Sequence, residues 1–296
     1  MRILVAGASG FLGSELVSFL KKRGHEVFSL TRHESNSNNS LYWDPDLNMM
    51  PCNELEGFDA VVNLAGDNIA TGRWSEGKKK KILNSRVNST KALNDCLANL
   101  KKPPKVLVNA SAIGIYGNRH DEVLSETNPS GSGFLANVCR QWEQAADEAK
   151  QSNIRVVKLR FGVVLSPTQG ALSKMLIPFK LGLGGKLGPG NQYISWIDIE
   201  DALRIILFAI QSPDLQGPIN VVAPQPVTNE EFTKAIGKAL NRPTFMNVPE
   251  PILKLIFGEM ANPLFLYSTR AMPQKLLESG YSFLYPTLES SLEKIK

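Results

Sequence analysis

Short apolar runs alternate with longer amphipathic stretches over the first two thirds of this chain. Strands that alternate with helices in this way indicate a parallel sheet covered by helices on both faces, with right-handed crossovers. The sequence therefore predicts an α/β fold with a doubly wound parallel sheet. The expected strands are 2–6, 25–30, 59–64, 105–110, 154–161 and 219–222, and the expected helices are 14–23, 75–99, 134–150 and 201–211.

Beyond residue 226 the pattern becomes mainly helical. We expect a domain of residues 1–225 and a small C-terminal lobe of residues 226–296, with residues at about 166–197 contributing to the cleft and the lobe. The lobe is expected to fold against the carboxyl edge of the sheet, where ligands bind in α/β proteins. Its predicted helices are 228–240, 250–259 and 273–279.

Two segments within the larger domain are expected to be loops. Residues 33–56 are mostly polar, and residues 182–190 are rich in glycine and contain a proline. Strand and helix signals resume after the second segment, so we interpret it as a mobile loop and not as a linker between domains.

The first predicted strand runs directly into the turn Gly7-Ala8-Ser9-Gly10-Phe11-Leu12-Gly13. Gly7 permits a sharp turn, Gly10 lets a pyrophosphate approach the backbone, and Gly13 lets the following helix pack closely on the sheet. The start of that helix offers free N–H groups and the positive end of its dipole to phosphates. A glycine trio between a strand and a helix predicts a Rossmann dinucleotide site, and the alternative is a purely structural turn.

The end of the second predicted strand discriminates between cofactors. NAD sites usually place a carboxylate there for the ribose 2′-hydroxyl, whereas NADP sites favour arginine. Here the strand ends in Thr31-Arg32, and Arg32 is suited to a 2′-phosphate, with Thr31 or Ser35 as hydroxyl donors. The sequence favours NADP(H). The alternative is that Arg32 is a surface charge and that Glu34 serves the ribose.

Composition narrows the class of protein. A hydrophobic content of 43% and a charged content of 21% in 296 residues are ordinary for a globular protein. No apolar run reaches the roughly 18 residues of a membrane helix, and the first residues do not resemble a secretory signal. We therefore expect a cytoplasmic protein that does not interact with membranes.

A net charge of +5 can indicate a protein that binds nucleic acid. The only dense basic run is Lys78–Lys81, on a predicted helix with an apolar stripe and without interleaved aromatic residues. We interpret the run as a solvated helix face and expect no nucleic-acid partner; attraction of anionic substrates is the other alternative.

Cysteine and histidine are sparse. Cys52, Cys96 and Cys139 are widely spaced, which suggests no disulfide framework and suits a reducing compartment. The three histidines are far apart in sequence, so no metal site is expected.

Several motifs together resemble the extended short-chain dehydrogenase/reductase (SDR) family. They are the glycine turn, Asn63-Leu64-Ala65-Gly66, Ser111 with Tyr116-Gly117, and the stretch 159–165. Within that family the chain resembles the group of sugar-nucleotide epimerases that includes YfcH. The motifs for this closer resemblance are Gly72-Arg73-Trp74, Ser85-Arg86-Val87, residues 111–117, Phe134-Leu135-Ala136 with Cys139 and Trp142-Glu143, Gln192 with Ser195-Trp196-Ile197, and Pro273–Leu277 with Gly280-Tyr281 and Phe283.

The resemblance implies a Rossmann domain, a small substrate lobe and an acid/base set of Tyr-x-x-x-Lys with a nearby serine. In such a set the lysine lowers the pKa of the tyrosine, which exchanges a proton with the substrate. When the family's helical glutamate is placed on Glu143, the tyrosine position falls on Leu135 and the lysine position on Cys139. The usual serine position falls on Ala112. The ordinary acid/base set is therefore missing.

Other side chains are candidates for these roles. Ser111 is a candidate for orienting the substrate, and Tyr116 is a candidate proton donor, although in the relatives this tyrosine is mainly structural. Arg86 and Arg160 are candidates for anion contacts or for ion pairs, and Asp201 for a helix cap or first-turn acid. The expected cofactor-binding residues are Gly7, Ser9, Gly10, Phe11, Leu12, Gly13, Thr31, Arg32, Leu64, Ala65, Gly66, Arg86, Ser111, Cys139, Phe161 and Gly162. The expected substrate-binding residues are Gln192, Ser195 and Trp196, of which the tryptophan could equally be part of the core between the lobes.

Two functions remain open from the sequence. The first is an NADP(H)-dependent oxidoreductase or epimerase for a small polar substrate, with a nucleotide sugar as one candidate. The second is a non-catalytic NADP(H)-binding sensor or adaptor, which the missing tyrosine and lysine favour. The protein is expected to be a monomer or a homodimer.

Overall fold

A seven-stranded parallel sheet organises the computed structural model, which describes residues 1–32, 38–47 and 49–295. Its strand order is β11-β7-β5-β4-β1-β2-β3, and every neighbouring pair is parallel. The predicted doubly wound α/β fold is confirmed. The strands are β1 (Arg2–Ala6), β2 (Glu26–Thr31), β3 (Ser40–Tyr42), β4 (Ala60–Asn63), β5 (Val106–Ala112), β7 (Arg155–Phe161) and β11 (Gly217–Val221).

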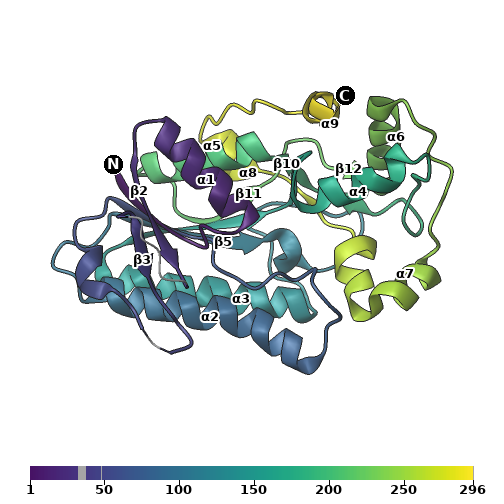
Figure 1. Ribbon diagram of the computed structural model, residues 1–296. Coiled ribbons are helices and arrows are strands. Elements are labelled where there is room, and N and C mark those ends of the chain that lie inside the picture. Colours follow the sequence, from purple (N-terminus) through teal and green to yellow (C-terminus); the bar gives the residue numbers. More distant parts are fainter. Residues whose placement is uncertain (33–37, 48, 296) are drawn as a thin grey trace.

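Helices cover both faces of the sheet (Figure 1). Helices α1 and α5 pack together on one face, and α2 and α3 pack together on the other. The central strands are therefore buried on both sides, which explains why they are continuously apolar and do not alternate. The bounds are Phe11–Lys22 for α1, Glu76–Ala98 for α2, Phe134–Asp147 for α3 and Ile199–Gln211 for α5.

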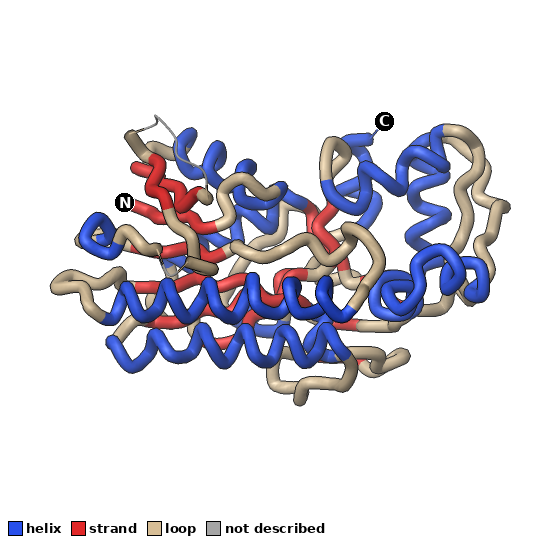
Figure 2. Tube along the Cα trace, turned by 60° about the horizontal axis from the view of Figure 1, so that its bottom comes forward, coloured by secondary structure: helices blue, strands red, loops and turns tan. Residues whose placement is uncertain are grey.

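A smaller group of helices lies at one end of the sheet, at the right of Figures 1 and 2. It comprises α4 (Gly170–Lys180), α6 (Asn229–Leu240) and α7 (Glu250–Phe257). In the described residues, three short strand pairs lie outside the central sheet: β8 (Val163–Leu165) with β10 (Trp196–Asp198), β9 (Tyr193–Ile194) with β12 (Val227–Thr228), and β6 (Val123–Leu124) with β13 (Arg270–Ala271).

The last part of the chain returns to the larger domain. Helix α8 (Gln274–Glu278) lies near β11, and α9 (Leu288–Leu292) packs on α6. The buried carboxylate of Asp201, in the first turn of α5, accepts hydrogen bonds from the backbone N–H groups of Leu284 and Tyr285 at 2.9 and 2.8 Å. Asp201 was expected to be a helix cap or a first-turn acid; the helix cap is Asp198, and Asp201 lies in the first turn, where it also fastens the C-terminal segment. The division at residue 225 stays a prediction.

Several observed elements were not predicted from the sequence, among them α9, the short strands outside the central sheet, β3 and α4, of which the last two show the physical reason. The segment 33–56 was expected to be a loop, yet within its described part β3 pairs with β2, and Trp43 is buried against the core. Helix α4 was not predicted, since Pro178 lies within it. Tertiary burial outweighs local sequence signals at both places.

Cys52 and Cys96 form a disulfide, which corrects the expectation that these cysteines are unpaired. A short turn of residues 52–55 brings Cys52 to α2, so that the two Cα atoms lie 5.2 Å apart although 44 residues separate them. Cys139 is a free, buried thiol. The cysteine argument for a reducing compartment therefore no longer applies.

Among the described residues, no helix has the length and apolarity needed to cross a membrane. The same part of the chain holds no cluster of three or more His, Cys, Asp or Glu side chains arranged for a metal ion.

Candidate functional site: a dinucleotide edge and an interlobe cleft

The glycine turn lies at the carboxyl edge of the sheet and packs against the end of the neighbouring strand. Gly7 has φ +77°, and a Cβ there would lie 2.7 Å from the carbonyl group of Leu64. A Cβ on Gly13 would lie 2.2 Å from the Gly7 carbonyl oxygen. The turn therefore excludes side chains at these two positions, as a close packing of strand, turn and helix requires.

The turn also leaves backbone groups available at the start of α1. Gly10 is the N-cap and supplies no side-chain hydrogen bond to the first turn of the helix, and Ser9 and Gly10 are exposed. The N–H groups of a helix start bind phosphate oxygens readily. Phe11 lies against Gly170, the first residue of α4. The residues present thus fit a dinucleotide pyrophosphate.

Arg32 is exposed directly after β2, and Thr31 shares a hydrogen bond with Ser40 on β3 at 3.1 Å. The alternatives Glu34 and Ser35 lie outside the described residues. An exposed guanidinium at this strand tip, without a carboxylate on the described strand end, suits a 2′-phosphate.

Arg86 lies beside the end of β4. Its guanidinium contacts Gly66, where a Cβ would lie 2.9 Å from Arg86 Cζ, and it lies 5.2 Å from the ring centroid of Trp142. Arg86 donates to the carbonyl oxygen of Ile82 at 3.0 Å, and burial lowers its pKa. An arginine held at this edge can donate to an anionic ligand.

Ser111 and Tyr116 belong to a buried polar network below the edge. Ser111 donates to Glu143 Oε1 at 2.8 Å, and Arg160 donates to both carboxylate oxygens of Glu143 at 2.8 and 3.0 Å. Arg160 also donates to the Tyr116 hydroxyl at 2.9 Å, and that hydroxyl donates to Asn220 Oδ1 at 2.8 Å. Arg160 thus forms the ion pair that was one of its two alternatives.

This network occupies both candidate catalytic hydroxyls. Tyr116 has no exposed surface, and burial raises its pKa. Ser111 is 3% exposed. A proton donor must reach the reacting group; we therefore include neither residue in the proposed chemistry.

Cys139 and Leu135 lie on α3 at the positions that the family resemblance assigns to lysine and tyrosine. The Cys139 thiol is buried, and burial raises its pKa to about 11, with the Glu143 carboxylate adding to the rise. Leu135 lines a cleft between the larger domain and the lobe. The helix therefore presents an apolar side chain at the position that the family resemblance assigns to a proton donor.

The expected substrate residues Gln192, Ser195 and Trp196 are all buried. Gln192 donates to the carbonyl oxygens of Leu187 and Phe265 at 2.8 and 2.9 Å, and Ser195 donates to that of Thr269 at 2.8 Å. Trp196 is part of the main core, which was its alternative interpretation. These three residues join the larger domain to the lobe, and none of them lines the cleft in the described part of the chain. Their role towards substrate stays untested.

Gly162 directly follows Phe161, the last residue of β7, at the same edge. A Cβ on Gly162 would lie 2.5 Å from the carbonyl oxygen of Ser195, so the small residue permits close contact between the two segments.

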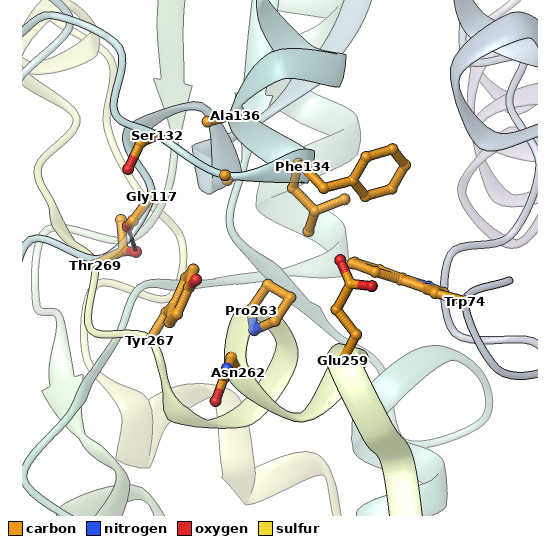
Figure 3. A pocket seen from close by; sticks show the side chains of 13 residues that line it. Trp74, Gly117, Ser132, Phe134, Ala136, Glu259, Asn262, Pro263, Tyr267 and Thr269 are labelled. Atoms are coloured by element: carbon orange, nitrogen blue, oxygen red, sulfur yellow. Dashed lines mark hydrogen bonds between the residues drawn. The ribbon is translucent and has the colours of Figure 1, made fainter. Parts of the chain in front are cut away.

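The cleft encloses about 510 Å³ including its open mouth. Figure 3 shows Trp74 and Phe134 on one side and Pro263 and Tyr267 on the other, with the Glu259 side chain pointing between them. The sequence analysis missed Glu259, Asn262 and Tyr267, because no local pattern indicates that the tail folds over residues 114–136. The lining residues are Trp74, Gly114, Gly117, Ser132, Gly133, Phe134, Leu135, Ala136, Glu259, Asn262, Pro263, Tyr267 and Thr269.

The parallel sheet, the glycine turn and the second lobe define an extended SDR protein. A family model described as "NAD dependent epimerase/dehydratase family" matches residues 3–223, and a domain of unknown function (DUF1731) matches residues 248–295. The chain belongs to the NAD dependent epimerase/dehydratase family. The predicted family is thus confirmed, while the closer resemblance to the YfcH group stays a prediction.

Individual relatives match this chain over nearly its whole length. The chain is 42% identical to the epimerase family protein Mb2239 of Mycobacterium bovis over 98% of this chain and 96% of the relative. The crystal structure of human SDR39U1 (isoform 2) with NADPH has a TM-score of 0.91 and 35% identity, covering 100% of this chain and 99% of that one. A nucleoside-diphosphate sugar epimerase from Corynebacterium glutamicum has a TM-score of 0.82 and 34% identity, covering 100% of this chain and 58% of that one.

Proposed function

We propose that this chain is an NADP(H)-dependent oxidoreductase or epimerase that acts on a small molecule in the interlobe cleft. The observation that carries the proposal is a cleft at the same sheet edge as the glycine turn, with Leu135 at its wall. In α/β proteins this edge is where cofactor and substrate meet. A human relative was crystallised with NADPH, which supports the choice of cofactor.

In this proposal, separate groups of residues bind the cofactor and orient the substrate. The start of α1 holds the pyrophosphate, Arg32 holds the 2′-phosphate, and Arg86 adds a donor beside Gly66. The bound cofactor supplies a carbon that accepts or donates hydride. The cleft walls orient the substrate and exclude water. A cytoplasmic location and the oligomeric state, monomer or homodimer, remain predictions.

A second candidate function is an NADP(H)-binding sensor without catalysis. One observation favours it, namely that Leu135 and Cys139 occupy the positions of the acid/base pair. It predicts cofactor binding with no turnover for any substrate.

The test is a fluorescence titration with NADPH and with NADH, for the native chain and Arg32→Ala. We expect Arg32→Ala to weaken NADPH binding by roughly 1–3 kcal/mol, the contribution of a charge-assisted contact, and to leave NADH binding nearly unchanged. Arg23→Ala is the matched control, because Arg23 lies at the opposite end of α1 and stacks on Phe19. Equal losses for both cofactors would disprove the 2′-phosphate role, and binding of neither would disprove the function.

A further inference from the structure

The order of the strands determines which way a bound dinucleotide runs along the carboxyl edge of the sheet. The order β2-β1-β4-β5 places Arg32, after β2, on one side of the glycine turn and the ends of β4 and β5 on the other side. The function proposed above places the 2′-phosphate at Arg32 and the pyrophosphate at the start of α1. The nicotinamide half must then extend past Gly66 towards Ser111 and Ala112 at the end of β5.

Arg86 of α2 lies at this nicotinamide end of the edge. Its guanidinium faces Gly66, where a Cβ would lie 2.9 Å from Cζ, 3.1 Å from Nη2 and 3.2 Å from Nε. On its other side, Cζ lies 5.2 Å from the ring centroid of Trp142 on α3. The Trp142 indole N–H in turn donates to the hydroxyl of Thr90, one turn further along α2, at 3.0 Å. These contacts hold the guanidinium at the edge.

The Arg86 charge lies close to the position that the family resemblance assigns to a lysine. That position is Cys139, one turn before Trp142 on α3. Burial and the Glu143 carboxylate raise the pKa of the Cys139 thiol to about 11, and the charge of Arg86 opposes this rise. The thiol is therefore neutral at pH 7. A cation is thus present at this part of the site, but it comes from α2 and not from α3.

No carboxylate neutralises this cation. Within residues 1–32, 38–47 and 49–295, Arg86 forms no ion pair, and its one hydrogen bond is from Nη1 to the carbonyl oxygen of Ile82 at 3.0 Å. The carboxylates of Asp67 and Glu143 are already paired with other lysine and arginine side chains. One positive charge at the nicotinamide end is therefore uncompensated.

We propose, on the basis of the function above, that Arg86 makes this chain bind the reduced cofactor, NADPH, in preference to the oxidised form, NADP⁺. The oxidised nicotinamide ring carries a positive charge and the reduced ring carries none, whereas the phosphates are the same in both forms. A fixed cation beside the ring repels only the oxidised form. Of the two activities proposed above, this preference favours reduction of the substrate, because epimerisation through a transient oxidation starts from the oxidised cofactor.

The experiment compares the dissociation constants of NADPH and NADP⁺ for the full chain. NADPH is titrated by its fluorescence, and NADP⁺ is measured by its displacement of bound NADPH from the same samples. We expect the native chain to bind NADPH roughly tenfold more tightly than NADP⁺, the effect of one unit charge at a partly screened distance.

Two variants separate the charge of Arg86 from its other contacts. Arg86→Gln removes the charge, and we expect the ratio of the two constants to fall to about one. Arg86→Lys keeps the charge and is expected to keep most of the native ratio. Lys91→Gln is the matched control with the native ratio, because Lys91 is an exposed cation of the same helix that pairs with Glu148. Both constants come from one sample, so their ratio does not depend on how much of a variant folds.

Three results would overturn the proposal. Equal constants for the native chain would show that no charge acts on the nicotinamide ring. If Arg86→Gln weakens both forms equally and keeps the native ratio, Arg86 binds the pyrophosphate instead. If Arg86→Lys behaves like Arg86→Gln, the charge is not responsible. None of these results disproves the proposed function, which fails when the native chain binds neither NADPH nor NADH.

Discussion

Single residues decide the chemistry that this protein can perform. Glu143 and Arg160 form a bidentate buried ion pair, and Ser111 and Tyr116 complete its hydrogen bonds. A buried charge that loses its partner costs several kcal/mol, so such a group is fixed in place once it is paired. The two hydroxyls that a sequence motif offers for catalysis are therefore held by hydrogen bonds of this buried network.

Cys139 gives this region a characteristic pH dependence. Burial raises the pKa of its thiol from 9.0 to about 11, so the unfolded chain releases this proton first as the pH rises. The free energy of unfolding is unaffected below about pH 9 and falls between about pH 9 and 11, by about 2–3 kcal/mol for two pKa units. Urea unfolding of the native chain and of Cys139→Ala at both ends of this window measures the effect. The prediction would be contradicted if the free energy of unfolding of Cys139→Ala fell by the same amount over this pH range.

The glycine turn could be predicted because its function is local. Gly7, Gly10 and Gly13 act within one turn, and their spacing carries the information. The partners of Tyr116 and Gln192 could not be predicted, because Asn220 and Phe265 lie 104 and 73 residues further along the chain. Glu259 and Tyr267 were missed for the same reason.

Among the helices and strands, periodicity predicted most of the central sheet and of the helices that cover it. Periodicity failed where tertiary packing determines the secondary structure, for example at β3 and α4. It also could not show that the lobe folds over the cleft. Helix α6 begins with a capping box, a local feature of the sequence. Thr228 accepts from the backbone N–H of Glu231 at 3.2 Å, and Glu231 accepts from that of Thr228 at 2.7 Å.

This capping box makes a prediction about stability. Thr228→Ala removes one of the two reciprocal bonds, and we expect it to lower the free energy of unfolding by about 1 kcal/mol. Thr228→Ser keeps the hydroxyl and is expected to remain close to the native chain. Urea denaturation of the three proteins measures these free energies of unfolding. An equal loss of stability in both variants would show that the methyl group of Thr228 is responsible and not the capping hydrogen bond.

Across the whole molecule, the C-terminal segment depends on one carboxylate. The Asp201 carboxylate accepts hydrogen bonds from the backbone N–H groups of Leu284 and Tyr285. It also accepts one from the hydroxyl of Tyr281, at 3.0 Å. We expect Asp201→Ala to cost about 1–3 kcal/mol for each backbone donor that stays buried without a partner. Residues 281–295 should then exchange amide hydrogens faster than in the native chain.

Asp214→Ala is the control for this prediction, because Asp214 is exposed just beyond the end of the same helix. Unchanged exchange at Leu284 and Tyr285 in Asp201→Ala would show that other contacts hold the segment.

The cleft has walls from segments that are more than a hundred residues apart, Trp74 and Phe134 on one side and residues 259–269 on the other. A molecule that fills it can bind only when the lobe is in place, so its binding energy is added to the stability of the folded chain. At a ligand concentration of a hundred times Kd this amounts to about 2.7 kcal/mol. A ligand of the cleft should therefore raise the melting temperature of the protein. A compound collection can be screened for this increase before any reaction is known.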